Sequence, residues 1–229
     1  MARASLLRVM APNVCLVAVA ALALAACSSS EKQVPFDDGQ GQVAAPELGA
    51  PREVYPAAPY GSRAGAIIEN FDFLGWKAPT NVAFDTTKLE QVSLGQFYDP
   101  DGAKGVKLLV MTSTAVWCSA CKQEYKDMTG NITTYEGKGV RFLGALFEDD
   151  ASQPAQPSDL VLWAKAFNVA FPFALDPDLK LGKFFDVEAT PMEMIVDAKT
   201  MKIVKISEGW VTQGDGSLWS DLDTLLASR

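Results

Sequence analysis

The sequence predicts an α/β domain in which a central mixed sheet is flanked by helices. Two compact apolar runs, Val106–Met111 and Val140–Phe147, have the length and the branched side chains of buried strands. Leucines in the last segment, 217–227, recur at helical spacing. A chain of 229 residues, 48% hydrophobic and 21% charged, is long enough for one good-sized globular domain with an appendage. We assign residues 65–229 to that domain.

The expected elements follow one another in a definite order. A short strand is followed by strand–helix–strand, a helix, a short strand, another helix, a hairpin and a final helix. Gly75 can turn the first strand, Pro177 opens the helix before the hairpin, and Asp99–Gly102 forms a turn that lacks the later ligands of a calcium loop. The expected ranges are 67–73, 106–111, 122–135, 140–147, 160–167 (capped by Ser158-Asp159), 171–175, 178–185, 192–196, 201–206 and 217–227.

The composition excludes several kinds of chemistry. Histidine is absent, which removes Ser-His-Asp and Cys-His catalysis and every histidine-ligated metal or haem site. The formal net charge is −8, and Lys and Arg form no cluster beyond the extreme N-terminus. Because binding to nucleic acid needs a basic face, we expect no nucleic-acid partner.

The first 26 residues have the anatomy of a signal peptide. Arg3 and Arg8 give a positive start, and the uncharged apolar run Val14–Ala26 is short for a membrane-spanning helix. The run ends in Leu24–Cys27, which resembles the bacterial lipobox. That resemblance implies cleavage before Cys27 and lipidation of its thiol. The alternative is ordinary secretion with Cys27 as a spare thiol.

The segment after the lipobox reads as a tether. Residues 27–64 are rich in Pro, Gly, Ala, Ser and Gln and show no lasting helical or strand period. Ser28, directly after the lipidated cysteine, resembles outer-membrane sorting in Gram-negative bacteria. If Cys15 leaves with the signal peptide and Cys27 is lipidated, Cys118 and Cys121 are the two free thiols, in an oxidation-permissive compartment.

The stretch TAVWCSACKQE, residues 114–124, contains these two cysteines. Cys118 follows an apolar run and lies in the first turn of an expected helix, where unpaired amides and the helix dipole favour a thiolate and lower its pKa. Cys121 lies one turn further along and can close a disulfide onto Cys118. We therefore expect Cys118 to attack and Cys121 to resolve the mixed disulfide.

Three other uses of the pair are weaker. A structural zinc site needs about four ligands, and the sequence offers neither a second CxxC nor a histidine. A purely structural disulfide gains little from so short a loop. A Cu(I) chaperone that uses both thiolates is chemically sound and is the second hypothesis. For the leading hypothesis we expect no cofactor and no resident metal.

Residues 115–121, AVWCSAC, resemble the A-x-W-C-x-x-C of thioredoxins. The longer pattern resembles the TlpA/ResA branch of bacterial thiol–disulfide oxidoreductases, which are membrane-tethered and often lipid-anchored. It includes Glu69–Phe73 at the entry, an insertion after the second buried strand, and Val187–Pro191 before a strand and hairpin. The resemblance implies a thioredoxin-like fold with the TlpA/ResA-type insertion before the helix that leads to a cis-proline.

The resemblance also implies site residues beyond the cysteines. Thr190 and Pro191 match the cis-proline loop beside the CxxC, where the backbone of Thr190 can pair with a substrate segment. Trp117 would join them in binding substrate. Glu124 matches the acid of C-x-x-C-x-x-E and could relay the proton of Cys121, although a solvated helix acid is the alternative.

Two positions depart from the thioredoxin pattern. Thr112, six residues before Cys118, stands where thioredoxins have a buried Asp. Thr114 stands where the family usually has an aromatic residue, and Ala115 breaks the TxxC of peroxiredoxins. These departures leave the redox potential and the direction of exchange open.

The expected function is a lipid-anchored thiol–disulfide oxidoreductase of the bacterial cell envelope. The resemblance favours reduction of disulfides in exported proteins that have cysteine pairs, supplied with electrons by an upstream redox partner. We expect the periplasmic face of a membrane, the outer more than the inner. The oligomeric state and the identity of the substrate do not follow from the sequence.

Overall fold

The computed structural model describes residues 54–229. The expected signal peptide, Cys27 and most of the expected tether lie outside the described residues. Residues 54–64, which the sequence assigns to the tether, contact the domain: Tyr55 Oη donates to the carbonyl of Ile68 at 2.8 Å, and the amide of Gly61 donates to Ile67 at 3.0 Å. Within residues 54–229, no helix is both long and apolar enough to cross a membrane.

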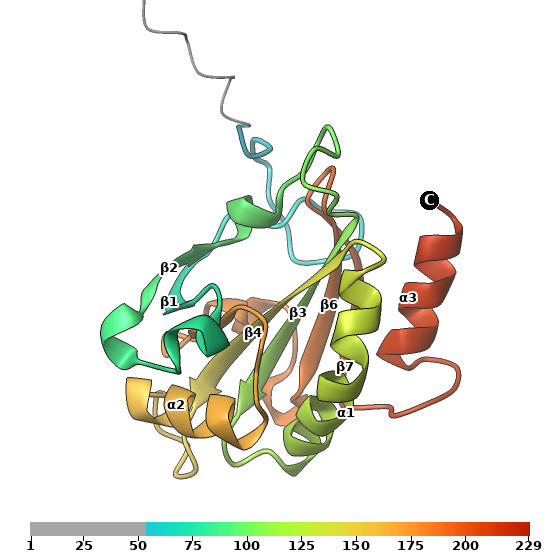
Figure 1. Ribbon diagram of the computed structural model, residues 1–229. Coiled ribbons are helices and arrows are strands. Elements are labelled where there is room, and N and C mark those ends of the chain that lie inside the picture. The colour runs from blue at the N-terminus through green and yellow to red at the C-terminus, as the bar shows by residue number, and fades with distance from the viewer. Residues whose placement is uncertain (1–53) are drawn as a thin grey trace, which may run out of the picture. The chain divides into compact units, whose positions relative to one another are not determined.

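A seven-stranded mixed sheet forms the centre of the domain, in the order β2-β1-β5-β4-β3-β6-β7 (Figure 1). The parallel centre β3-β4-β5 is extended by antiparallel pairs on both sides. The strands are β1 (Asp72–Trp76), β2 (Glu90–Ser93), β3 (Leu108–Ala115), β4 (Val140–Glu148), β5 (Phe173–Leu175), β6 (Met192–Asp197) and β7 (Lys202–Glu208). The prediction of a central mixed sheet flanked by helices is confirmed.

Three α-helices cover one face of the sheet (Figure 1): α1 (Ser119–Glu136), α2 (Pro157–Ala166) and α3 (Leu218–Ala227). Tyr125 of α1 packs edge-on against Trp163 of α2, with ring centroids 5.3 Å apart. Tyr135 of α1 stacks on Trp219 of α3 at 5.0 Å. The aromatic contacts hold α1 between the other two helices.

The opposite face is covered by short turns rather than by helices. Successive side chains of a strand alternate between faces, so Phe142 and Phe147 of β4 point to opposite sides. Phe142 contacts Trp219 of α3, whereas Phe147 contacts Phe185 in the segment before β6. The core is therefore divided by the sheet, and the segment around Phe185 packs on the side away from α1.

Several expected elements need correction. The first strand begins at Asp72 rather than 67, and Gly75 lies inside it: a Cβ there would come within 2.4 Å of the Phe173 carbonyl oxygen across the pair with β5. Strand β2 was not expected, because its exposed, polar sequence shows no clear alternation. Helix α2 has Gln156 as its N-cap residue, and of the predicted pair Ser158-Asp159 only Asp159 takes part in the cap, where its carboxylate accepts from the Gln156 amide at 2.8 Å.

The helix expected over 178–185 is only a 3-10 turn, Lys180–Lys183. The buried carboxylate of Asp176 accepts hydrogen bonds from the amides of Lys180 and Leu181, at 2.8 and 3.0 Å. Leu179 has a left-handed backbone with φ 49°. A side chain that binds amides in this way competes with helical hydrogen bonding, so the segment remains a turn.

Candidate active site

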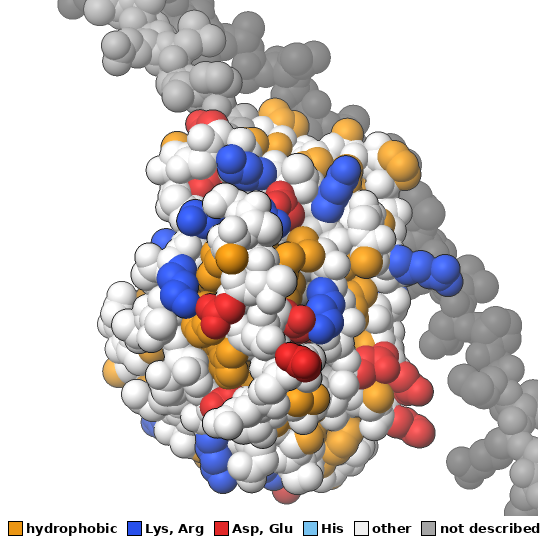
Figure 2. All heavy atoms as spheres, turned by 90° about the vertical axis from the view of Figure 1, so that its right-hand side faces the viewer, with side chains coloured by type: hydrophobic (Ala, Val, Ile, Leu, Met, Phe, Trp, Pro, Cys, Tyr) orange, Lys and Arg blue, Asp and Glu red, His pale blue; other side chains and the backbone are white. Residues whose placement is uncertain are grey.

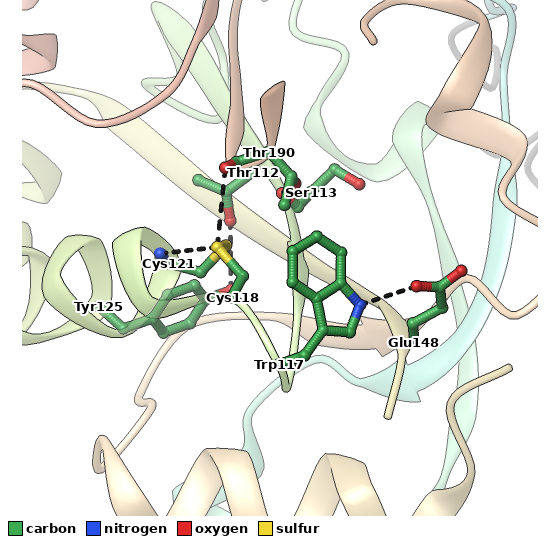
Figure 3. Close-up of a disulfide and its surroundings, with 8 residues drawn as sticks. All are labelled: Thr112, Ser113, Trp117, Cys118, Cys121, Tyr125, Glu148 and Thr190. Carbon is green, nitrogen blue, oxygen red and sulfur yellow. Dashed lines mark hydrogen bonds between the residues drawn. A yellow bond between two sulfur atoms is a disulfide. The ribbon is translucent and has the colours of Figure 1, made fainter. Parts of the chain in front are cut away.

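The cysteine pair lies where the buried strand β3 gives way to α1 (Figure 3). Every side chain of β3 is buried, and the helix begins at Ser119, three residues earlier than the sequence predicted. Cys118 is the N-cap residue: its Sγ accepts a hydrogen bond from the amide of Cys121 at 3.0 Å. The sulfur takes the place of the side-chain oxygen that usually satisfies a free amide at a helix start.

Cys118 and Cys121 form a disulfide, with their Cα atoms 5.3 Å apart. The two cysteine residues differ slightly in their exposure to solvent. Cys118 retains 3% of its surface, and Cys121 retains none. A substrate can therefore approach the Cys118 side of the disulfide, whereas Cys121 is shielded by the protein.

The loop before β6 lies directly against the cysteines. The Thr190–Pro191 peptide bond is cis, as the resemblance led us to expect. The carbonyl oxygen of Thr190 lies 3.7 Å from Cys118 Sγ (Figure 3). The hydroxyl of Thr190 donates a hydrogen bond to the carbonyl of Ser113 in β3 at 3.2 Å. The amide of Gly209 donates to the carbonyl of Pro191 at 2.8 Å. The loop is thus attached on one side to β3 and on the other to the end of β7.

Trp117 lies on the solvent side of the pair and is 37% exposed. Its Nε1 donates to Oε2 of Glu148 at 2.8 Å, and its ring packs edge-on against Phe147 with centroids 6.4 Å apart (Figure 3). From the sequence, the run 148–150 is interpreted as a solvated acidic loop, with lining of the approach to Cys118 as the alternative. Only the parallel pairing of β3 with β4 places the end of one strand beside the end of the other.

Glu124 lies on the inner side of the helix, one turn beyond Cys121. It has no exposed surface, and neither of its carboxylate oxygens has a hydrogen-bond partner among the described residues. The alternative that Glu124 is a solvated helix acid is therefore wrong. Burial, together with the nearby carboxyl of Glu193, raises the pKa of Glu124 well above its usual range.

Thr112 occupies the position at which thioredoxins have a buried Asp. It is 1% exposed, and its hydroxyl lies 3.2 Å from Oη of Tyr125 (Figure 3). The hydroxyls of Ser113 and Thr114 next to it are buried without a partner among the described residues. The strand behind the cysteines is thus polar at three successive positions and contributes no charge.

Glu193 is a second buried acid in this region, and sequence reasoning did not single it out. It lies in β6, directly opposite Thr112 of β3, and is 4% exposed. The one available signal was an acid inside an otherwise apolar strand sequence, MEMIVD. Burial is the main cause that raises the pKa of Glu193, to about 8.

A groove of about 480 Å³ lies between the start of the CxxC helix and α2. Its lining is mostly apolar, and Lys and Asp side chains contribute at its rim. The residues that line it are Val116, Lys122, Lys126, Asp150, Asp159, Leu162, Trp163, Ala166 and Phe167. Val116 links the groove to Trp117, so a chain bound there would also reach the cysteines.

The arrangement has the parts of a dithiol–disulfide centre. Over residues 54–229 we find no cluster of three or more Cys, Asp or Glu side chains that could hold a metal ion. The arrangement can support nucleophilic exchange at Cys118 and proton transfer near Cys121.

Comparisons with known proteins agree with this site. The sequence profile of the AhpC/TSA family matches residues 74–206, which include both cysteines and the cis-proline loop. The thiol-disulfide oxidoreductase ResA of Bacillus subtilis (strain 168) is 25% identical over 139 residues, covering 61% of this chain and 69% of ResA.

Solved structures resemble the chain in fold. A protein described as a thiol:disulfide interchange protein DsbE, from Chlorobium tepidum, superposes with a TM-score of 0.55 at 16% identity, covering 72% of this chain and 99% of its own. A thiol:disulfide interchange protein from Bacteroides sp. gives 0.52 at 15% identity, with 72% and 91% covered. Both support a thioredoxin-like architecture.

Proposed function

The chain belongs to the AhpC/TSA family and is a thioredoxin-like thiol–disulfide oxidoreductase, and we propose that it reduces disulfides of exported proteins from a membrane tether. One observation supports the catalytic part above all others: Cys118 caps α1, is disulfide-bonded to Cys121 and lies against the Thr190 carbonyl. This arrangement gives one sulfur access to substrate and the other a protected position.

In the reduced protein, Cys118 is the attacking thiolate. The free amides at the start of α1 stabilise its negative charge, and no histidine is needed to activate it. Cys118 Sγ attacks one sulfur of the substrate disulfide, and the other substrate sulfur leaves as a thiolate that takes up a proton. Cys121 then attacks Cys118 Sγ, which releases the second substrate thiol and forms the internal disulfide.

Glu124 would manage the proton of Cys121 in this cycle. A buried thiol must lose its proton before it can attack, and bulk water does not reach Cys121. Glu124 is one helical turn away, on the same side of the helix, and burial holds its pKa closer to that of a thiol. We therefore assign Glu124 the role of proton acceptor in the resolving step.

The substrate would bind across the outer side of the pair. Thr190 and Pro191 supply backbone groups beside Cys118, and Trp117 supplies an exposed aromatic surface. The groove beside Val116 can take apolar side chains of a polypeptide. On the face that carries α3, Lys and Arg side chains are dispersed among acidic and apolar ones, which fits protein partners better than nucleic acid (Figure 2).

The location is also a proposal. It is supported by the signal-like residues 1–26 and by Cys27 in its lipobox context. A lipidated Cys27 would tether the domain at the periplasmic face of a bacterial membrane. Ser28, which follows the lipidated cysteine, favours the outer membrane. There it would meet exported proteins with cysteine pairs and an upstream partner that restores the dithiol.

The catalytic roles are tested with the full chain carrying Cys15→Ser and Cys27→Ser, so that Cys118 and Cys121 are the reacting thiols. This protein, in which Cys118 and Cys121 are both present, should reduce insulin with dithiothreitol as the electron source. Cys121→Ser should abolish turnover and accumulate mixed disulfides, because the resolving thiol is lost. Cys118→Ser should abolish turnover without trapping partners.

Two results would contradict the catalytic proposal. The first is insulin reduction that neither cysteine substitution changes. The second is stoichiometric, tight Cu(I) binding by a chain with no reductase activity, which would favour a copper chaperone.

The tether is tested separately by Cys27→Ser in the otherwise natural chain. The lipidated protein should fractionate with membranes, and the variant should move to the soluble periplasmic fraction. Because the lipobox resemblance ties cleavage to Cys27, a variant that stays with the membrane would overturn the lipid anchor only if its residues 1–26 have been removed, which the mass of the purified chain establishes. Ser28→Ala serves as the matched control, since it leaves the lipidated cysteine in place.

A further inference from the structure

A second buried acid behind the cysteines is not explained by packing. Glu193 is 4% exposed, and its Oε1 has no hydrogen-bond partner among the described residues. The other five residues of the strand are Met, Met, Ile, Val and Asp at its end. Burial of a carboxyl group without a hydrogen bond is costly, so a chain that needed only a strand here would place an apolar residue at this position.

The strand register places Glu193 next to a position where an acid is missing. Glu193 pairs with Thr112 across the antiparallel β3·β6 ladder. Directly opposite residues of such a pair have their side chains on the same face, a few ångströms apart. Thr112 reaches Tyr125 of α1, so Glu193 also lies on the α1 side of the sheet, which is the side of Cys121 and Glu124.

The charged groups around Glu193 come from three elements. On α1, Glu124 and Asp127 carry acids, and Asp127 accepts a hydrogen bond from Nε1 of Trp219 at 2.6 Å. On α3 and β7, Asp221 and Lys205 form an ion pair. The side chains of that pair are 23% and 37% exposed. Glu193 therefore lies between the fully buried Glu124 and a charged pair that reaches solvent.

We propose that Glu193 and Glu124 form an acid pair that stores the proton of Cys121. In this pair Glu193 replaces the buried acid that thioredoxins have at the position of Thr112. The inference rests on the proposed function and deepens it. Glu193 acts through Glu124 and not on a sulfur, so it is a positioning residue. The Lys205–Asp221 pair marks the side from which the stored proton exchanges with solvent.

The proton and the electrons balance over one cycle. In the disulfide form, both carboxyl groups are protonated. When an upstream dithiol transfers two electrons and breaks the Cys118–Cys121 bond, the dithiol becomes a disulfide and its two protons pass to solvent. Cys121 Sγ takes one proton from the pair, and Cys118 remains a thiolate. In the resolving step the pair takes that proton back as Cys121 Sγ bonds to Cys118 Sγ. The substrate sulfur leaves with the electron pair of the broken bond.

The electrostatics agree with this arrangement. Two carboxylates in one buried region cannot both ionise easily, so the pair titrates as a unit. Burial is the main cause that raises the pKa of both groups; the carboxyl of Glu193 adds to the rise at Glu124, and those of Asp221 and Asp127 help to raise the pKa of Glu193 to about 8. An acid pair of this kind retains a proton at neutral pH and can exchange it with a thiol of similar pKa.

The test separates the two chemical steps in the full chain carrying Cys15→Ser and Cys27→Ser. The reduced protein is mixed with the aromatic disulfide dithiobis(nitrobenzoate), and release of the coloured thiolate is followed by stopped flow. Attack by Cys118 releases the first thiolate, and resolution by Cys121 releases the second. The rates of both phases are measured between pH 6 and pH 9, a window chosen to bracket the raised pKa values.

Glu193→Gln should slow the second phase by about tenfold at neutral pH, because Glu124 alone is a weaker proton acceptor, and should move its pH dependence downward, because Glu124 loses the neighbouring carboxyl group that raises its pKa. The first phase should stay within about twofold, since the environment of Cys118 is unchanged. Glu69→Gln is the matched control: the same chemical change at an exposed acid should leave both phases as they are. If the second phase of Glu193→Gln has the same rate and pH dependence as the second phase of the protein with Glu193, the inference is overturned.

A relocated acid provides a further readout that a structural role would not produce. In Thr112→Asp/Glu193→Leu, the acid returns to β3 opposite its former position. This double variant should recover most of the resolving rate that Glu193→Leu loses. A folded double variant with no recovery would overturn the claim that an acid between these strands sets the rate. Failure of the proposed function would look different, as the Glu193-containing protein would then show no second phase at all.

Discussion

Two buried acids of this domain, Asp99 and Glu193, have pKa values that are shifted in opposite directions. Asp99, in the turn before β3, has no exposed surface, and Glu193, in β6, is nearly as buried. Asp99 accepts hydrogen bonds from the amides of Lys104 and Val106, at 3.0 and 2.7 Å. Burial alone would raise its pKa, but these amides lower the pKa of Asp99 below its usual range. Glu193 lacks such donors, and its pKa rises to about 8.

The difference shows that backbone hydrogen bonds can outweigh burial, as they do at Asp99, whereas at Asp176, which also accepts from two amides, burial prevails and raises the pKa. Backbone amides favour the carboxylate and make it part of the fold. An acid surrounded by apolar side chains and another acid keeps its proton instead. The first arrangement stabilises a turn, and the second leaves a proton available beside a reactive thiol.

The largest expected effect is at the satisfied acid. Asp99→Ala should lower the free energy of unfolding by about 2–4 kcal/mol at pH 7, because two amides of a buried turn lose their acceptor. The folded-state pKa of Asp99 is depressed, so its contribution is present above the unfolded value near 4 and is lost as pH falls through the folded pKa. Urea denaturation at pH 7 and at pH 3 measures both.

Asp101→Ala is the control within the same turn. Asp101 is exposed and accepts from the amide of Ala103 at 2.9 Å, so the cost should stay below about 1 kcal/mol. Equal losses for the two variants would contradict the distinction between them.

The unsatisfied acid should behave in the opposite way. Glu193 has a raised folded-state pKa, so its contribution to stability is fully present below the unfolded value near 4.5 and is lost as pH rises through about 8. Oxidised Glu193→Leu should therefore become more stable relative to the natural residue as pH rises from 5 to 9, by about 1–3 kcal/mol. Denaturation curves at both pH values measure the change, and a constant difference between them would rule out a protonated Glu193.

The smallest effect belongs to an exposed acid. Glu69 pairs with Lys183 at 2.8 Å, and both side chains are nearly half exposed. Glu69→Gln should change the free energy of unfolding by less than about 0.5 kcal/mol, and the change should vanish in high salt. A loss comparable to that of Asp99→Ala would mean that exposure does not separate these acids. Thermal denaturation with and without salt is sufficient to measure it.

Much of the fold was predictable because it follows from local patterns. Val140–Phe147 is a continuous apolar run and forms β4 with one further residue, Glu148. The last helix was placed within one residue, since Ser217 caps it and leucines define one face. The segment 178–185 was not predictable, because the carboxylate of Asp176 competes for its amides.

The reactive pair is evident from the order of the residues alone. Two cysteines three positions apart, after a buried strand, on a chain without histidine, leave thiol–disulfide exchange as the favoured chemistry. Thr190-Pro191 could be recognised from its own motif, and its cis bond agrees with that resemblance. These features lie in short stretches of chain, so the chemistry that they need is visible in the residue order.

The surroundings of the pair depend on how distant segments pack together. Glu148 reaches Trp117 because β4 ends beside β3, and Glu193 stands opposite Thr112 because β6 runs antiparallel to β3. These contacts join residues that are 31 and 81 positions apart, and no local pattern encodes such a register. Burial and charge pairing, which set the protonation of Glu124 and Glu193, exist only once the sheet and α1 have packed together.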